Sequence, residues 1–327
     1  MIIEQRRAVT LGGEDALQVQ QERCRRFDLR VADFCLRRTA PCRRIFVMKA
    51  VALIHPDTPE RAVRPFQEIC PELRVIAGLY AAEDVSAALI FGGDGTIHRY
   101  LPELHRYKIP GLVVPCGSGN DFAKALGIRN VKIAFAAWKH FCRSGDNIRA
   151  VDLGVIRTRD KEILFCCVAG GGLDAKSNAL ANRMPAWLRA RGGYVLAALR
   201  SLATGQPQEI RVATPEMHLT GPGWLAAVAN AGSYGGGLKI APQASLDDGM
   251  LDVCRVAKMN KIKLLCAFPM LFSGTHVRLK EVEYFKAAAV RLESNPALEI
   301  YADGEPVGHT PAEFSILPKA IHVIAPV

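Results

Sequence analysis

Two glycine-rich polar loops, each placed directly after a short apolar run, constrain this chain more than any other feature. The first loop, GGDGT, follows the run 87–91, and the second, PCGSGNDFA, follows the run 111–114. Glycines at such positions permit left-handed backbone and let a ligand come close to the chain. Three glycines interleaved with Asp94 and Thr96 exceed what a plain turn needs. The first loop is therefore predicted to wrap an anion, most simply a phosphate group.

The segments around these loops alternate between strand and helix. Strands are predicted at 49–55, 73–77, 87–91 and 111–114, and helices at 58–70, 97–105 and 121–126. Because the strands are almost continuously apolar, the pattern predicts an α/β domain with a parallel, doubly wound sheet. Ligands of such sheets bind outside the carboxyl ends of the strands. Both glycine loops are expected at those ends.

Beyond about residue 150 the pattern changes to short strands separated by turns. Strand-like runs occupy 151–156, 163–168, 210–213, 224–229, 251–256, 290–292, 298–302 and 321–325, and helical spacing is confined to 178–204 and 260–272. This predicts a second, mostly antiparallel, β-sandwich-like domain. The expected domains are 48–149 and 150–327, with the last residues packing back on the first domain.

The first 47 residues lack a clean period of either 2 or 3.6. The apolar strand that begins the first domain follows directly after Met48. We expect residues 1–47 to lie outside the core, either as an extension upstream of a natural start at Met48 or as a disordered basic arm.

Composition excludes several classes of protein. The chain has 327 residues, of which 50% are hydrophobic, and this is enough for two domains with cores of their own. No apolar run reaches the roughly 18 to 20 residues of a membrane-spanning helix, and no secretory signal is visible, so a cytoplasmic protein is expected. Ten cysteines without a C-x-x-C pair predict buried or incidental thiols rather than disulfides or zinc. The net charge of +10 fits nucleic acid, an anionic membrane or a phosphorylated ligand.

Simpler interpretations of the loops exist. GGDGT matches neither G-x-G-x-x-G nor the Walker A pattern, and it could be a structural turn. Its amides and the following helix can nevertheless bind phosphate, to which Thr96 can donate, while Asp94 can orient a hydrated cation. In the second loop, Asn120 and Asp121 could simply cap a helix. Two such loops on neighbouring strands favour the phosphate interpretation.

Taken together, these motifs carry a family resemblance. GGDGT followed about 20 residues later by PCGSGNDFA resembles the catalytic domain of the diacylglycerol kinase family, which bacterial lipid kinases and sphingosine kinases share. The resemblance continues through VANAGSYGGGLKIAPQASLDDGMLDV, YADGEPV and the ending LPKAIHVIAPV. It covers about residues 48–327.

The resemblance implies transfer of the γ-phosphoryl group of ATP to a lipid hydroxyl, with Mg²⁺. It implies that the nucleotide is bound by Gly92, Gly93, Asp94, Gly95, Thr96, Ile97, His98, Gly117, Ser118, Asn120 and Asp121. Asp303 stands at the position of the general base, with Glu305 beside it. The Asp248 side chain and the carbonyls of Ser245 and Met250 stand at a metal site.

Physical chemistry is compatible with these implied roles. Phosphoryl transfer needs positioning, charge neutralisation and a proton acceptor, and a carboxylate such as Asp303 can accept a proton. Asp247, Asp248 and Gly249 form an oxygen-rich turn that suits a hard cation. From the residues alone, however, Asp303-Gly304 indicates a hairpin turn.

The sequence also departs from the family pattern. HPDTP stands where an NP-x-x-G motif is common, and the segment between Val75 and Ala87 is short. After GGDGT-x the family often carries Asn and then Glu, whereas His98 and Arg99 stand here. His98 could donate to a phosphate or be an exposed helix residue. These differences motivate one alternative, a degenerate member that binds nucleotide and signals or scaffolds. The other is a NAD-kinase-like enzyme, because that family shares GGDGT.

The lipid side is less specific. Residues 176–207 contain no acid, and Lys176, Arg183 and Arg189 alternate with apolar side chains such as Trp187. The segment is either a membrane-surface element that binds anionic phospholipid or a packed helix with a solvated arginine face. No nucleic-acid motif is present, so nucleic acid is not expected as a partner. We expect a cytoplasmic, peripherally membrane-associated enzyme, and a homodimer is an open alternative.

Overall fold

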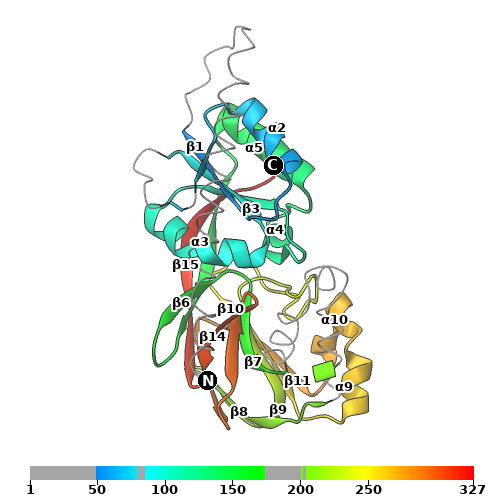
Figure 1. Cartoon of the computed structure of the whole chain (residues 1–327). Coiled ribbons are helices and arrows are strands. Elements are labelled where there is room, and N and C mark those ends of the chain that lie inside the picture. Colours follow the sequence, from blue (N-terminus) through cyan, green and yellow to red (C-terminus); the bar gives the residue numbers. More distant parts are fainter. Residues whose placement is uncertain (1–48, 77, 80–84, 174–199, 202–203) are drawn as a thin grey trace, which may run out of the picture.

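Figure 1 shows the computed structural model, which describes residues 49–76, 78–79, 85–173, 200–201 and 204–327. The first part is a parallel sheet in the strand order β2-β1-β3-β4. Its strands are β1 (Ala50–Ile54), β2 (Arg74–Ile76), β3 (Ala87–Gly92) and β4 (Gly111–Pro115). β3 is buried along its whole length, as expected for a strand covered on both faces.

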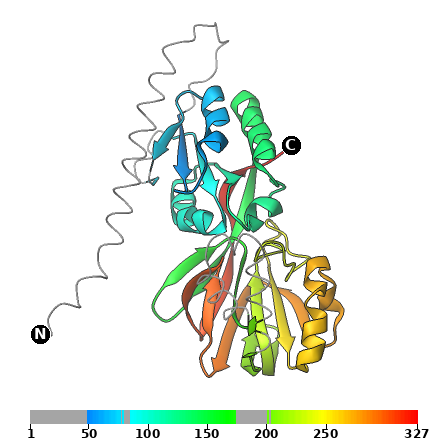
Figure 2. The same cartoon turned by 45° about the vertical axis from the view of Figure 1, so that its right-hand side comes forward.

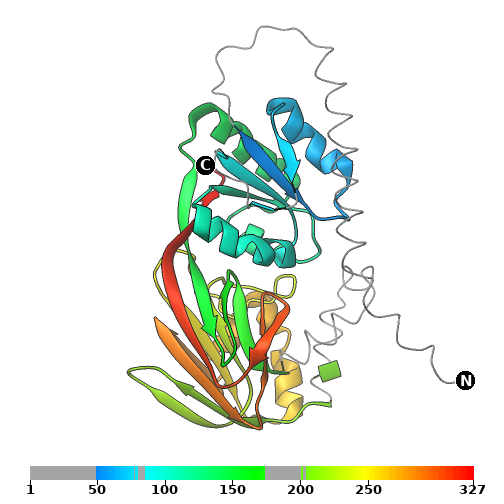
Figure 3. The ribbon, with the colours of Figure 1, turned by 60° about the vertical axis from the view of Figure 1, so that its left-hand side comes forward.

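Helices cover both faces of this sheet. They are α2 (Glu60–Ile69), α3 (Asp94–Tyr107), α4 (Asp121–Ala125) and α5 (Val131–Ser144). α2 and α5 lie together on one face, where the ring of Phe66 meets those of Phe91 and Phe135 edge-on at 5.2 and 5.3 Å. α3 covers the opposite face, which is turned toward the second part of the molecule (Figures 1 and 3). The doubly wound prediction is confirmed.

The second part is mostly antiparallel. Its strands are β5 (Ile148–Arg157), β6 (Glu162–Phe165), β7 (Val168–Gly172), β8 (Gln208–Ala213), β9 (His218–Ala229), β10 (Leu251–Ala257), β11 (Val282–Ala287), β12 (Ala289–Asn295), β13 (Glu299–Ala302), β14 (Glu305–His309) and β15 (Ala312–Ile324). Helices α9 (Lys261–Ala267) and α10 (Met270–Ser273) and the 3-10 turn Thr275–Arg278 lie beside β10 and β11. One side of this sheet encloses a separate core that includes Phe165, Leu292 and Phe314, while Trp224 and Cys254 belong to the core cluster that continues into the first part.

One strand joins the two parts. β15 runs antiparallel to β5 from Glu313 to Ile324 and pairs in parallel with β4, where Val323 lies opposite Gly111. Figures 2 and 3 show it passing from the lower part into the upper sheet, so that the C-terminus lies on the first part. Because β5 and β15 are shared, the face of α3 is held against the second part.

The structure corrects several predicted elements. The predicted strand 163–168 is two strands, β6 and β7, which are separated by a bend at Cys166 and Cys167. The predicted helix 260–272 is interrupted, and Pro269 precedes the short α10. α3 begins at Asp94, inside the first glycine loop, rather than at Ile97. α5, β11 and β14 were not predicted.

Some expectations fall on residues that the structure does not describe. Residues 1–47 and most of the basic segment 176–207 lie outside the described ranges. Within those ranges, all seven cysteines are free, and four of them, Cys70, Cys166, Cys167 and Cys254, are buried, which agrees with the predicted thiols. Among the helices that are described, none has both the length and the apolar character needed to cross a membrane.

Candidate active site

The two glycine loops touch at the carboxyl edge of the parallel sheet. β3 and β4 pair up to Gly92 and Pro115, so both chains leave the sheet side by side. A Cβ added to Gly117 would lie 2.4 Å from the Cα of Gly93, and one on Gly92 would lie 2.4 Å from Oγ1 of Thr96. The glycines are therefore needed for this close approach as well as for any ligand.

The first turn of α3 lies at this edge. Gly93 occupies the N-cap position and supplies no side-chain cap, so the positive end of a 14-residue helix begins inside GGDGT. Such an end favours anions. Ile97 is fully buried, and its N–H donates to the carbonyl of Gly93 at 3.1 Å. Any contribution of Ile97 to a ligand is thus restricted to its backbone, whereas Ser118 is exposed on the neighbouring loop.

Asp94 ties the first loop to the second. Its carboxylate oxygens accept hydrogen bonds from the N–H groups of Asp121 and Phe122, both at 3.0 Å, and therefore cap α4 from another helix. Gly119 is small because a Cβ there would lie 2.8 Å from Oδ2 of Asp94. Burial, followed by the charge of Asp121, raises the pKa of Asp94 to about 6. This cross-loop cap was not predicted from the sequence.

Asn120 and Asp121 differ from simple N-caps. Asn120 has a φ of 56° and makes no side-chain cap. Its amide instead donates to the carbonyl of Gly117 at 2.7 Å and accepts from that residue's N–H at 3.0 Å, so it closes its own loop. Asp121 is buried and accepts from the N–H of Gly236 at 2.7 Å, which connects α4 to the glycine-rich turn of the second domain.

Asp303 comes from the second domain and reaches the first. It lies in the turn between β13 and β14, where it and Gly304 have φ values of 50° and 91°, as a two-residue hairpin of this kind requires. The hairpin-turn interpretation is thus confirmed. In addition, its side chain is 0% exposed and contacts Nδ1 of His98 at 3.0 Å. Glu305 lies near the first turn of α3, with Oε1 3.3 Å from where a Cβ on Gly95 would be.

The bend at Cys166 and Cys167 supplies most of the donors to this carboxylate. The N–H groups of Cys166, Cys167 and Val168 donate to it at 2.9, 2.8 and 3.3 Å. Strand pairing is interrupted here because these N–H groups turn toward Asp303. The buried Cys166 thiol lies 3.4 Å from the same carboxylate, and burial raises its pKa to about 12. The Cys166 thiol is therefore protonated at neutral pH and forms part of the frame around the carboxylate.

His98 is not an exposed helix residue. Its side chain is 14% exposed and lies between α3 and the β13–β14 hairpin. Burial lowers the pKa of the imidazole, but the hydrogen bond to Asp303 and the charges of Asp303 and Glu305 outweigh it, so the pKa is raised above the ordinary 6.5. The residues next to His98 in the sequence give no sign of this contact with Asp303.

The predicted metal turn holds a different cation. Oδ2 of Asp248 lies 2.5 Å from Nζ of Lys286, which also lies 3.6 Å from Oδ2 of the buried Asp252. Ser245 donates to Asp247 at 2.8 Å, and the N–H of Met250 donates to Asp248 at 3.1 Å. The carboxylate is thus already neutralised by an ammonium group, which a Mg²⁺ ion at this turn would have to displace.

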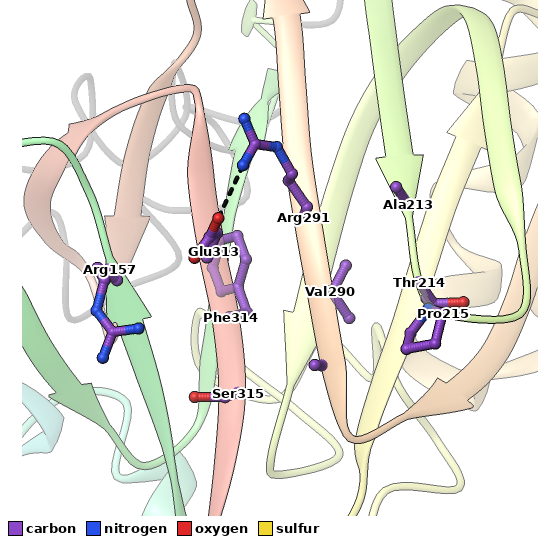
Figure 4. Close-up of a pocket in the computed structure, with 10 residues that line it drawn as sticks. Arg157, Ala213, Thr214, Pro215, Val290, Arg291, Glu313, Phe314 and Ser315 are labelled. Carbon is purple, nitrogen blue, oxygen red and sulfur yellow. Dashed lines mark hydrogen bonds and ion pairs between the residues drawn. The ribbon is translucent and has the colours of Figure 1, made fainter.

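A pocket lies elsewhere, on the sheet of the second domain. It has a volume of about 400 Å³ and is lined by Arg157, Thr214, Arg291 and Phe314, among others. Figure 4 shows that Arg291 pairs with Glu313 across it, at 2.8 Å. None of its lining residues belongs to the glycine loops or the Asp303 hairpin. It is therefore not part of the candidate active site.

Comparison with known proteins gives matches along both domains. Residues 49–156 match the diacylglycerol kinase catalytic domain, and residues 167–325 match the YegS C-terminal NAD kinase beta sandwich-like domain. A diacylglycerol kinase of Mycobacterium tuberculosis (strain H37Rv) is 34% identical over 263 residues, which cover 78% of this chain and 82% of that protein. A diacylglycerol kinase of Bacillus subtilis is 30% identical over 256 residues, covering 75% and 80%.

Solved structures agree on the fold. A Bacillus anthracis crystal structure matches with a TM-score of 0.69 at 20% identity, covering 87% of this chain and 98% of that one. The family models matched along both parts of this fold, together with the diacylglycerol kinase relatives, place the protein in the lipid kinase class. More narrowly, the chain belongs to the diacylglycerol kinase family, and the resemblance found from its motifs is confirmed.

Proposed function

We propose that the protein is an ATP-dependent lipid kinase that transfers the γ-phosphoryl group to the hydroxyl of a diacylglycerol-like lipid. The observation that carries the proposal is the 3.0 Å contact between His98 and Asp303, because it places the acidic hairpin of one domain against the helix that opens the glycine loop of the other. Phosphoryl transfer depends on such positioning of the phosphates, the acceptor and a proton acceptor.

The phosphates of ATP would lie over the first turn of α3 and the touching loops. Backbone amides near Gly93 and Gly117 and the helix N-terminus suit their charge. Ser118, exposed on the second loop, is available to donate to them. The acceptor hydroxyl would approach from the side of the Asp303 hairpin, where the contact between His98 and Asp303 lies.

Magnesium enters this proposal as a companion of ATP, where it neutralises phosphate charge. A structural ion held by Ser245, Asp248 and Met250 stays a prediction, and it would have to displace the ammonium group of Lys286 from Asp248. No catalytic step is assigned to that ion.

A face of the second domain supports peripheral attachment to an anionic membrane. Ile262, Leu265 and Phe272 of α9 and α10 are 77%, 49% and 50% exposed. The segment that contains them also carries four exposed cations, Lys258, Lys261, Arg278 and Lys280. Apolar side chains surrounded by cations are the composition that binds an anionic lipid surface. The acids nearest in sequence are engaged, since Glu281 pairs with Lys263 and Glu283 with Arg255.

The second candidate is a kinase for NAD, because the family matched by residues 167–325 is described as NAD kinase beta sandwich-like. Radiolabelled ATP offered with dioleoylglycerol in mixed micelles, with a total bacterial lipid extract, or with NAD separates the candidates. Label in the dioleoylglycerol product is the expected result. Label in NAD alone would contradict the lipid kinase proposal and favour a NAD kinase. Nucleotide binding without transfer to any acceptor would indicate a degenerate member.

A further inference from the structure

Asp303 is poorly placed to take a proton from a substrate directly. Its carboxylate is fully buried and accepts from three backbone N–H groups, from the Cys166 thiol and from His98. Two carboxylate oxygens offer about four lone-pair sites, and these donors occupy them. The backbone donors are fixed by the bend between β6 and β7 and cannot give way to a lipid hydroxyl.

Among the described residues that contact this carboxylate, only His98 has a second nitrogen. Nδ1 faces Asp303, which leaves Nε2 on the opposite side of the ring. Among the residues that the structure describes, no group is hydrogen-bonded to Nε2, and that atom is not among the buried polar atoms left unsatisfied. The imidazole therefore has one end anchored and the other accessible.

This arrangement fixes the tautomer. An ionised carboxylate can only accept, so Nδ1 must carry a proton toward Asp303. In the neutral ring Nε2 then keeps its lone pair and can accept a proton. A buried carboxylate that orients an imidazole and stabilises its charged form is a known way to make histidine a general base.

We propose that His98 is the general base of the phosphoryl transfer and that Asp303 is its positioning residue, an inference that rests on the proposed function. Nε2 accepts the proton of the lipid hydroxyl while the hydroxyl oxygen forms a bond to the γ-phosphorus. The bond from that phosphorus to the bridging oxygen of ADP breaks, and ADP leaves with the electron pair. The imidazolium later gives its proton to solvent.

The charged groups around the ring support this assignment. The hairpin presents Asp303 and Glu305 to the ring, and the bend presents the protonated thiol of Cys166 to the same Asp303 carboxylate. The nearby anions favour the imidazolium that forms when the proton arrives. The acid limb of kcat/KM should therefore lie above pH 6.5, the ordinary pKa of histidine.

The test measures transfer from radiolabelled ATP to dioleoylglycerol in wild type, His98→Asn and Asp303→Asn. Loss of positioned proton transfer is worth about 10² to 10⁴ in rate, so His98→Asn should lose kcat by that factor. ATP affinity, measured by titration, should change by less than about threefold.

Asp303→Asn should move the acid limb of the kcat/KM profile to lower pH, because the raised pKa of His98 depends on Asp303. The double variant should be no slower than the slower single variant, as for residues that act as a unit.

His105→Asn is the matched control. It lies on the same helix and binds the carbonyl of Ala320 on β15 at 2.8 Å, away from the hairpin. It should keep full turnover even where its melting temperature falls. Full turnover by His98→Asn together with loss by Asp303→Asn would overturn the inference and make Asp303 the direct acceptor, with the proposed function intact. Absence of transfer by the wild type would instead overturn both.

Should His98→Asn fail to fold, the wild-type profile still decides. An acid limb at or below pH 6.5 would contradict a base whose pKa Asp303 and Glu305 raise.

Discussion

Asp94 combines a structural contact with an unfavourable charge. Its carboxylate caps α4, yet burial and the charge of Asp121 raise its pKa to about 6 from 3.8. A raised carboxyl pKa means that the folded state holds the proton more tightly than the unfolded state does. This contribution to stability is present below pH 3.8 and is lost as the pH rises through about 6.

Asp94→Asn tests this charge. The variant loses one acceptor at all pH values, but its amide does not ionise. Between pH 4 and pH 7, the unfolding free energy of the wild type should therefore fall by up to about 3 kcal/mol relative to the variant. Urea unfolding of both proteins across this range measures the difference. Asp57→Asn, at a side chain that is 87% exposed, should track the wild type. Parallel curves for Asp94→Asn and wild type would show that the buried charge has no such effect.

At the scale of elements, Lys286 and a Mg²⁺ ion would compete for the Asp248 carboxylate in the turn between Ser245 and Met250. Lys286 on β11 neutralises Asp248 and the buried Asp252, so replacing it with Met leaves two uncompensated carboxylates. We expect Mg²⁺ to raise the melting temperature of Lys286→Met more than that of the wild type, and Asp248→Ala to remove the gain. Lys263→Met, which breaks the separate pair with Glu281, is the control.

An equal Mg²⁺ response of wild type and Lys286→Met would contradict competition at this turn. A strong response of the wild type that disappears in Asp248→Ala would show that the ion displaces the ammonium group and would support the predicted metal site.

Elements whose causes are local were predictable from the sequence. The apolar run before Gly92 and the glycines after it predict β3 and its loop, because burial and backbone freedom act within a few residues. The family motif adds Asp303, whose position no local pattern distinguishes from a hairpin turn. In the structure, Asp303 has the backbone conformation of a hairpin turn, and its carboxylate also points into the protein.

Elements whose causes are distant were not predictable. The break between β6 and β7 arises because Cys166 and Cys167 donate to a carboxylate 137 and 136 residues away. Likewise, the partner of His98 is 205 residues away, and the cap of α4 comes from Asp94, 27 residues earlier. An apolar run such as 163–168 does not indicate which of its N–H groups bond to a distant side chain instead of to a neighbouring strand. These long-range contacts make up most of the candidate site.

At the scale of the whole molecule, the shared strand β15 fixes the hairpin over the glycine loops, while α9 and α10 lie on another side of the second domain (Figure 1). A lipid kinase must meet its substrate in a membrane, so the orientation of the protein on the bilayer matters for turnover. The exposed face of Ile262, Leu265 and Phe272, with the cations around it, provides that orientation in our proposal.

The triple variant Ile262→Ser, Leu265→Ser, Phe272→Ser tests this face. Full burial of a large apolar side chain stabilises by about 1.5 to 3 kcal/mol. Since only the exposed part of each of these three side chains can enter the membrane, the loss is smaller per residue, and binding to phosphatidylglycerol-rich vesicles should weaken by at least about tenfold. Cosedimentation measures the bound fraction, which should also fall in wild type as salt is raised. Met217→Ser, an exposed apolar side chain between β8 and β9, should bind like the wild type. Turnover on short-chain dioctanoylglycerol in solution should be unchanged in the triple variant, since the face lies outside the glycine loops and the hairpin. Vesicle binding equal to that of the wild type would mean that another part of the surface meets the membrane.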